Sequence, residues 1–156
     1  MQALHQALQK GHLVRVFLSV VVVILSLFVC LSAEAGKNYG NVAVARVVSV
    51  YDGDTFRADL EGYPAITGEN IPIRIKGIDT PGMRDKRPEI KALARDAREF
   101  TKDMLESGNV IILRNIERGK YFRIVADVYV DGVSLSHGLL LLELAKPYDG
   151  GKKPVW

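Results

Sequence analysis

Three isoleucines, Ile71, Ile73 and Ile75, alternate with other residues in the middle of the chain, and this alternation constrains the fold most strongly. A period of two is typical of a β-strand with one buried face. Successive side chains on a strand point to opposite faces, so the isoleucines enter a core and Arg74 lies on the other face. We expect this strand to cover residues 71–78.

Further segments with strand or helix character surround it. β-Branched residues and flanking turn residues predict four more strands, at Val42–Tyr51, Thr55–Leu60, Val110–Leu113 and Ile124–Val130. Apolar residues at three- and four-residue spacing predict one helix, from near Glu89 to Gly108. A second, short helix is expected after an N-cap at Ser134, with Leu135, Leu139 and Leu142 facing inward.

These elements predict a mainly β member of the α+β class. Five short strands, with one helix after the third strand and a short C-terminal helix, suggest a Greek-key barrel of the OB-fold type. The period and the turns by themselves support only a small α+β domain. The 156 residues have room for a single domain, which we expect to span residues 36–156. Residues 146–156 are rich in Pro and Gly and predict a tail.

The first 35 residues resemble a targeting segment. Lys10 and Arg15 precede an apolar run, Val16–Leu31, and a small-residue cleavage site ends at Ala35. Removal after Ala35 predicts a secreted or periplasmic protein without cysteine. The alternative is an uncleaved anchor in the inner membrane formed by residues 16–33, because the run approaches the length that crosses a bilayer.

Charged residues gather near the ends of the predicted strands. Asp54 follows Asp52 and Gly53 in a turn, and Asp79 follows the isoleucine strand that carries Arg74. Two carboxylates and an arginine on one rim suit a hard cation such as Ca²⁺ together with a phosphate. Asp-Gly and Asp-Thr-Pro are also ordinary turn sequences, so either motif alone predicts little. The net charge of +3 permits a polyanionic partner without requiring one.

A third motif, Gly119-Lys120-Tyr121-Phe122-Arg123, precedes the strand at 124–130. Together with the Asp-Gly-Asp-Thr and Asp-Thr-Pro motifs, in this order, it resembles the staphylococcal nuclease (thermonuclease) family. The resemblance covers about residues 42–148. It implies an OB-fold nuclease that hydrolyses phosphodiester bonds in DNA and RNA with little sequence specificity. No protein partner is implied, and we expect a monomer.

The resemblance also implies roles for single residues. Asp54, Asp79 and the carbonyl of Thr80 match the family's Ca²⁺ ligands. Arg74 and Arg123 match its two phosphate-binding, catalytic arginines, and their planar forks suit phosphoryl oxygens. Substrate-binding roles are implied for three residues, Lys120, Tyr121 and Tyr148.

Structural roles are the alternatives for several of these residues. Arg123 could pair with Asp127 at the barrel rim, Tyr121 could pack at a strand entrance, and Tyr148 could pin the tail to the barrel. Lys152 and Lys153 are expected to be solvated, with contact to phosphates as the alternative.

Gly82 departs from the family pattern. The family places a glutamate after Asp-Thr-Pro, proposed to activate or position the attacking water, and glycine offers no side chain for either role. Losing a general base costs a factor of about 10²–10⁴ in rate. Asp85 or Glu89 in the same loop could substitute, although Glu89 suits the first helical turn better. The alternative function is therefore a nucleic-acid-binding OB-fold protein with weakened catalysis.

Overall fold

The structure is a computed structural model that describes residues 37–156. The predicted targeting segment, residues 1–35, lies outside the described residues. Within residues 37–156, no helix has both the length and the apolar character needed to cross a membrane.

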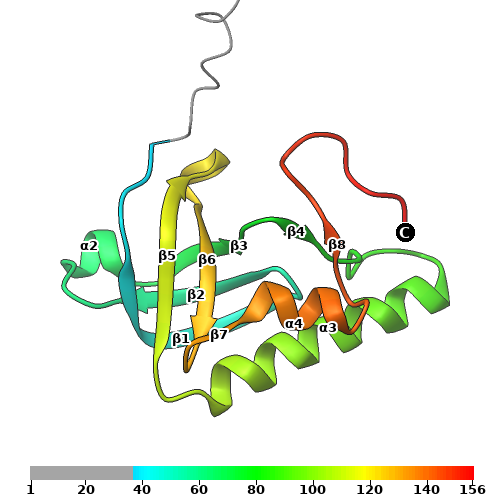
Figure 1. Cartoon of the computed structure of the whole chain (residues 1–156), viewed down its shortest axis with the longest axis horizontal. Coiled ribbons are helices and arrows are strands. Elements are labelled where there is room, and N and C mark those ends of the chain that lie inside the picture. Colours follow the sequence, from blue (N-terminus) through cyan, green and yellow to red (C-terminus); the bar gives the residue numbers. More distant parts are fainter. Residues whose placement is uncertain (1–36) are drawn as a thin grey trace, which may run out of the picture. The chain divides into compact units, whose positions relative to one another are not determined.

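Five strands close into a barrel (Figure 1). They hydrogen-bond in the order β3-β2-β1-β5-β6, and a parallel pairing of β3 with β6 closes the circle. The barrel strands are β1 (Val42–Asp52), β2 (Thr55–Leu60), β3 (Ile71–Ile75), β5 (Ile111–Arg118) and β6 (Ile124–Val130). Ile73 and Ile75 are fully buried and Arg74 lies on the outer face, as the alternation predicted. The mainly β, OB-type barrel is confirmed.

Two helices pack against the barrel. α3 (Pro88–Ser107) begins with a proline in its first turn, where the missing N–H costs no hydrogen bond. Its buried side chains include Ala94, Ala97 and Leu105. α4 (Leu135–Leu141) lies beside α3 (Figure 1). Ser134 caps it by accepting a hydrogen bond from the N–H of His137 at 3.3 Å, as predicted.

The remaining elements are short. They are α2 (Ala65–Gly68), β4 (Ile78–Asp79), the 3₁₀ turn η1 (Lys120–Phe122), β7 (Val133–Ser134) and β8 (Lys146–Pro147). β7 forms a hairpin with β6, and β8 pairs with β4.

Several predicted boundaries were wrong. The isoleucine strand ends at Ile75, because Gly77 adopts a left-handed turn (φ 79°) before β4 starts. β5 extends to Arg118 rather than Leu113, with an irregular register between Arg114 and Glu117. Leu142 is 54 % exposed, because α4 ends one residue before it.

The C-terminal residues form more than a tail. Their strand β8 lies antiparallel to β4, with Asp79 opposite Lys146. This pairing carries the rest of the segment, residues 148–156, past the carboxylate of Asp79.

Candidate active site

Asp54 is fixed by the tight turn between β1 and β2. A Cβ atom on Gly53 would lie 2.7 Å from the Ala97 Cβ and 2.8 Å from the Thr80 Cγ2, so only glycine fits between α3 and the Thr80 loop. The hydroxyl of Thr101 donates a hydrogen bond to the Gly53 carbonyl at 2.7 Å. The turn is therefore anchored to α3, and it presents the Asp54 carboxylate, which is buried (2 % exposed).

Asp79 and Thr80 form the other wall of the site. Asp79 ends β4 and is also buried. The N–H of Thr80 donates to Oδ2 of Asp54 at 3.0 Å. Two residues predicted to be metal ligands are thus joined directly, although they lie 26 positions apart in the chain.

Arg74 joins the two carboxylates. Its register partner on β2 is Thr55, so its guanidinium reaches the end of the β1–β2 turn. Nη1 donates to Oδ1 of Asp54 at 2.5 Å, and Nη2 donates to Oδ1 of Asp79 at 3.1 Å. The Arg74 side chain is 13 % exposed, and those of Asp54 and Asp79 are 3 % and 2 % exposed. One planar cation therefore holds two buried anions in a fixed geometry.

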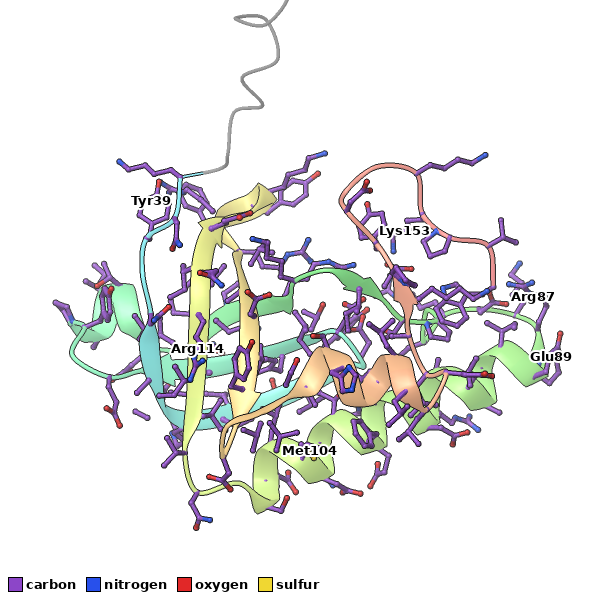
Figure 2. The ribbon with its side chains drawn as sticks, viewed as in Figure 1. Tyr39, Arg87, Glu89, Met104, Arg114 and Lys153 are labelled. Carbon is purple, nitrogen blue, oxygen red and sulfur yellow. The ribbon has the colours of Figure 1, made fainter. Side chains whose placement is uncertain are left out.

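The C-terminal segment contributes a second cation that the sequence reasoning missed. Nζ of Lys153 lies 2.9 Å from Oδ1 of Asp79, and Nε1 of Trp156 donates to Oδ2 of Asp79 at 3.4 Å. Arg87 donates to the carbonyl oxygen of Trp156 at 2.7 Å. The Lys153 side chain is 69 % exposed, in keeping with the expected solvated residue. Its ammonium nevertheless pairs with Asp79, because the β4–β8 pairing directs residues 148–156 back to this carboxylate. Figure 2 shows Lys153 on this segment.

Tyr148 also comes to the site. Its ring lies 5.5 Å from the guanidinium carbon of Arg74, a cation–π distance. Its N–H donates to the carbonyl of Gly77 at 2.9 Å. The residue both holds the C-terminal segment to the barrel and covers Arg74. The two roles considered for it, substrate binding and holding the tail to the barrel, are therefore compatible.

Arg123 directly precedes β6, the strand that pairs with β3, which carries Arg74. In the parallel β3–β6 pairing Arg74 is opposite Val125, two residues after Arg123. The predicted pair with Asp127 is absent from the described residues, since Asp127 accepts from Asn115 at 2.8 Å. Nε of Arg123 is buried without a hydrogen-bond partner in residues 37–156.

The turn before Arg123 is strained. Tyr121 (φ 59°) and Phe122 (φ 58°) are both left-handed, a conformation that costs about 1–3 kcal/mol for each non-glycine residue. Their side chains are 91 % and 81 % exposed, so Tyr121 does not pack at the strand entrance. Lys120 is exposed beside them. Strained backbone of this kind is typical of functional sites.

Gly82 is exposed just beyond Thr80 and Pro81. Of the two carboxylates considered as its substitute, Asp85 is poorly suited to act as a base. Hydrogen bonds from Arg87 lower the pKa of Asp85 to about 2, so Asp85 accepts a proton poorly. Glu89 lies in the first turn of α3, at the outer end of that helix (Figure 2).

Asp52 is a third carboxylate beside the site. Its Oδ1 accepts a hydrogen bond from the N–H of Asp54 at 3.2 Å. Burial, and then the neighbouring charge of Asp54, raise the pKa of Asp52 from 3.8 to about 6. The Asp-x-Asp spacing in the sequence was the signal for this residue, and the sequence reasoning used only its second aspartate.

The raised pKa makes the stability of the protein depend on pH. Between pH 4 and 6 the folded state binds more protons at Asp52 than the unfolded state, so stability falls as pH rises. Above pH 6 the ionised, largely buried carboxylate lowers the stability of the folded state. We expect Asp52→Asn to be more stable than the wild type at pH 7.5 in chelator, with little difference at pH 4. Urea unfolding at both pH values tests this, with the exposed Asp96→Asn as control; an equal gain at both values would contradict it.

The oxygen atoms of the site fit a hard divalent cation. Asp54 and Asp79 supply buried carboxylates, and the Thr80 hydroxyl beside them is buried without a hydrogen-bond partner in residues 37–156. In these same residues, no group of three or more His, Cys, Asp and Glu side chains is placed to hold a metal ion. A metal would therefore take only two carboxylates from the chain and complete its shell with carbonyl, water or phosphate oxygens, which Ca²⁺ tolerates.

Comparison with known proteins identifies the family of the chain. The sequence model of the family described as "Staphylococcal nuclease homologue" matches residues 72–152. Endonuclease YncB of Bacillus subtilis (strain 168) is 30% identical over 112 residues, which cover 70% of this chain and 49% of YncB. The SPbeta prophage-derived endonuclease YokF of the same strain is 31% identical over 113 residues, covering 70% of this chain and 35% of YokF.

The chain thus spans about half or less of the length of these relatives. The family match covers more than half of the chain, including Arg74, Asp79 and Arg123. It ends at residue 152, just before Lys153. The barrel, its closing β3–β6 pairing and these matches together show that the chain belongs to the staphylococcal nuclease homologue family.

Proposed function

We propose that the protein is a Ca²⁺-dependent nuclease that hydrolyses phosphodiester bonds in DNA and RNA with little sequence specificity. The observation that carries the proposal is the fork of Arg74 between the buried carboxylates of Asp54 and Asp79. A structural ion pair needs one acid for one base. Here two buried acids share one arginine, and the second cation at the site, Lys153, is 69 % exposed, so that a metal ion can compete with it for Asp79.

The residues divide the work of the reaction. Asp54, Asp79 and the Thr80 carbonyl would hold the metal. A bound calcium ion supplies positive charge that polarises phosphoryl oxygens and lowers the pKa of a bound water. Arg74, on β3, and Arg123, just before the neighbouring β6, would bind the phosphoryl oxygens and stabilise the charge that builds during water attack. The family resemblance implies departure of the 5′ oxygen and 3′-phosphate products.

Three other residues would bind the substrate. Lys120 and Tyr121 are exposed on the turn before Arg123, where an ammonium and a phenol hydroxyl suit a phosphate. Tyr148 covers Arg74 and offers an aromatic face on which a base can stack.

Cleavage of single-stranded DNA by the purified protein, in Ca²⁺ and in chelator, tests the proposal. We expect cleavage in Ca²⁺ that chelator stops. The Asp54→Asn variant keeps the shape of the side chain but removes its charge, so it should lose this cleavage, which excludes a contaminating nuclease. Metal-independent cleavage, or full activity of Asp54→Asn, would contradict the proposal.

A nucleic-acid-binding protein with weakened catalysis is the second candidate. It is favoured by Gly82, which has no side chain to act as a base, and by the pKa of Asp85, which Arg87 lowers to about 2. DNA binding without cleavage in the same experiment would support this candidate.

The ion pair of Lys153 with Asp79 leads to a prediction about metal binding. An ammonium and a metal ion compete for the same carboxylate, so Lys153→Met should strengthen Ca²⁺ binding. Because the Lys153 side chain is 69 % exposed, we expect a gain of up to about fivefold. Calorimetry measures the affinity, and fluorescence of Trp156, the only tryptophan, reports the change beside Asp79. Lys152→Met is the matched control. Weaker binding by Lys153→Met would show instead that Lys153 orients Asp79 for the metal.

We also propose export of the chain, with removal of residues 1–35, and a monomeric domain. Determining the N-terminal sequence of the protein recovered from cells tests the first point: a start at Gly36 supports cleavage, and an intact N-terminus in the membrane fraction supports the anchor. Size-exclusion chromatography with light scattering tests the second.

A further inference from the structure

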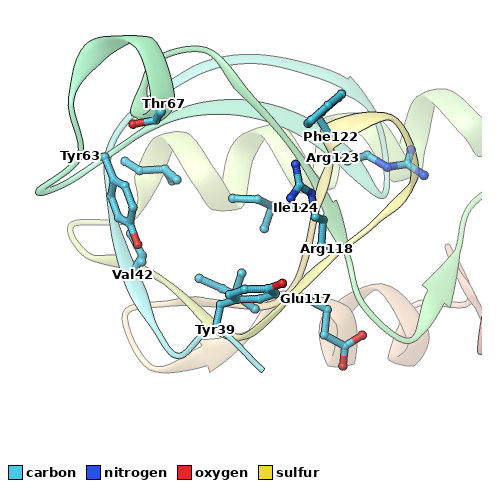
Figure 3. A pocket seen from close by; sticks show the side chains of 11 residues that line it. Tyr39, Val42, Tyr63, Thr67, Glu117, Arg118, Phe122, Arg123 and Ile124 are labelled. Atoms are coloured by element: carbon cyan, nitrogen blue, oxygen red, sulfur yellow. The ribbon is translucent and has the colours of Figure 1, made fainter. Parts of the chain in front are cut away.

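A pocket of about 360 Å³ opens at the end of the barrel where β1 begins and β2 ends (Figure 3). It is separate from the carboxylate site, since neither Asp54, Asp79 nor Arg74 lines it. Its inner wall is apolar and comes from four barrel positions, Val42, Leu60, Ile116 and Ile124.

Three aromatic side chains stand around the opening, and we call the cavity the aromatic pocket. Tyr39 comes from the segment before β1, Tyr63 from the loop after β2, and Phe122 from the turn between β5 and β6. They are 52 %, 50 % and 81 % exposed. Figure 3 shows them on different sides of the cavity. Exposed aromatic residues gathered around one concave site are typical of a ligand-binding surface.

The charge of the opening favours an anionic ligand. The guanidinium of Arg118 lies 4.9 Å from the centre of the Phe122 ring, and Arg118 has no carboxylate partner within residues 37–156. Glu117, the acidic residue of the wall, is neutralised by Lys76 at 2.5 Å. The ammonium of Lys37 lies 5.4 Å from the Tyr39 ring. Aromatic faces flanked by unpaired cations are the surface to which single-stranded nucleic acid binds.

The aromatic pocket adjoins the phosphate-binding side of the barrel through Arg123. Arg123 and Ile124 both line the pocket, and Figure 3 shows the end of the Arg123 side chain directed away from the centre of the cavity. A phosphate on Arg123 and a base in the pocket would therefore lie on the two sides of one short turn. An OB fold holds about 4–16 nucleotides of single-stranded nucleic acid. A DNA or RNA strand bound at Arg123 therefore extends beyond the carboxylate site.

We propose that the aromatic pocket binds a nucleobase of the DNA or RNA strand, next to the phosphate held by Arg123. The base enters between Tyr39 and Phe122, and Arg118 binds the phosphate that follows it. The inner wall is apolar and offers few hydrogen-bonding groups, so stacking dominates and the pocket accepts different bases. This inference rests on the proposed nuclease function and adds a subsite to it.

Binding of a fluorescent single-stranded 12-nucleotide DNA to the full protein in chelator tests the proposal. One base at a time is removed by placing an abasic residue at each position, and the affinity is measured for the wild type and for Phe122→Leu, Phe122→Tyr and Tyr39→Ala. Leu keeps an apolar contact without a π face, and Tyr restores the face. Leu141→Ala, 73 % exposed on α4, is the control. The same oligonucleotides are cleaved in Ca²⁺ to obtain kcat/KM.

For the wild type, we expect an abasic residue at one position to weaken binding about fivefold to 150-fold, the effect of losing one stacked base. Phe122→Leu and Tyr39→Ala should bind the intact strand more weakly and lose the dependence on that position, while Phe122→Tyr and Leu141→Ala should keep it. Identical abasic profiles for the wild type, Phe122→Leu and Tyr39→Ala would overturn the aromatic pocket as a base site. If the wild type cleaves DNA and Arg123→Ala weakens cleavage, that result leaves the nuclease function standing. If the wild type neither binds nor cleaves DNA, both proposals fail.

Discussion

Replacing Arg74 by lysine is expected to lower kcat/KM for single-stranded DNA by about 10²–10³, the usual effect of removing one donor to the transition state. Lysine keeps the positive charge but places it at a single point. It cannot donate to Asp54 and Asp79 at 2.5 and 3.1 Å while presenting a flat edge to a phosphate. The loss should therefore appear mainly in kcat, as expected for an interaction that strengthens in the transition state.

The same side chain contributes to stability. Arg74→Met removes the charge and leaves two buried carboxylates without their shared partner, which we expect to cost about 3–5 kcal/mol in chelator. Ca²⁺ binds only the folded site and should restore part of this loss. Urea unfolding with and without Ca²⁺ measures both effects. Arg95, exposed on α3, provides the controls Arg95→Lys and Arg95→Met. An Arg74→Met protein as stable as the wild type in chelator would show that the ion pairs of Arg74 with Asp54 and Asp79 do not stabilise the folded state.

The sequence predicted those elements whose signals are local. The alternation of Ile71, Ile73 and Ile75 predicted a buried strand face, and the structure buries Ile73 and Ile75 completely. It could not predict where the strand ends, because Ile78 continues the apolar pattern on the far side of a left-handed Gly77. β5 was predicted too short for a related reason. Asn115 has φ 51° and the register shifts beside it, so the alternation is lost although the strand continues.

The residues of the site also differ in whether a local sequence pattern could predict their position. Asp54, Arg74 and Asp79 lie within one stretch of the chain, where turn and strand patterns place their side chains at one rim. The contacts of Lys153 and Trp156 with Asp79 span 74 and 77 residues and depend on the two-residue pairing of β4 with β8. A pairing this short carries no periodicity. The Pro and Gly content of residues 146–156 therefore predicted a loose tail, where the structure has a segment bound to the site.

Replacing Gly82 by glutamate is expected to raise the cleavage rate by about 10²–10⁴, the contribution of a positioned general base. The backbone accepts the change. A Cβ atom at Gly82 meets no atom within 4 Å, and its φ lies outside the left-handed region. The new side chain would start two residues after Thr80, at the edge of the carboxylate site. Gly82→Gln is the matched control, since it has the same size and cannot take up a proton.

The comparison of these two variants separates three explanations for the glycine. If Gly82→Glu accelerates cleavage and Gly82→Gln does not, the natural protein lacks a base that its site could use. A wild type that also binds DNA without cutting it is then a nucleic-acid-binding protein with the fold of a nuclease. If both variants accelerate cleavage equally, the added side chain acts by excluding or ordering water. If neither does and the wild type cuts rapidly, Arg74, Arg123 and the metal suffice without a carboxylate at this position. The last result is the most informative. Hydrogen bonds from Arg87 lower the pKa of Asp85 to about 2, so Asp85 cannot serve as the base. A fast wild type would then owe its rate to electrostatic stabilisation of the phosphoryl group.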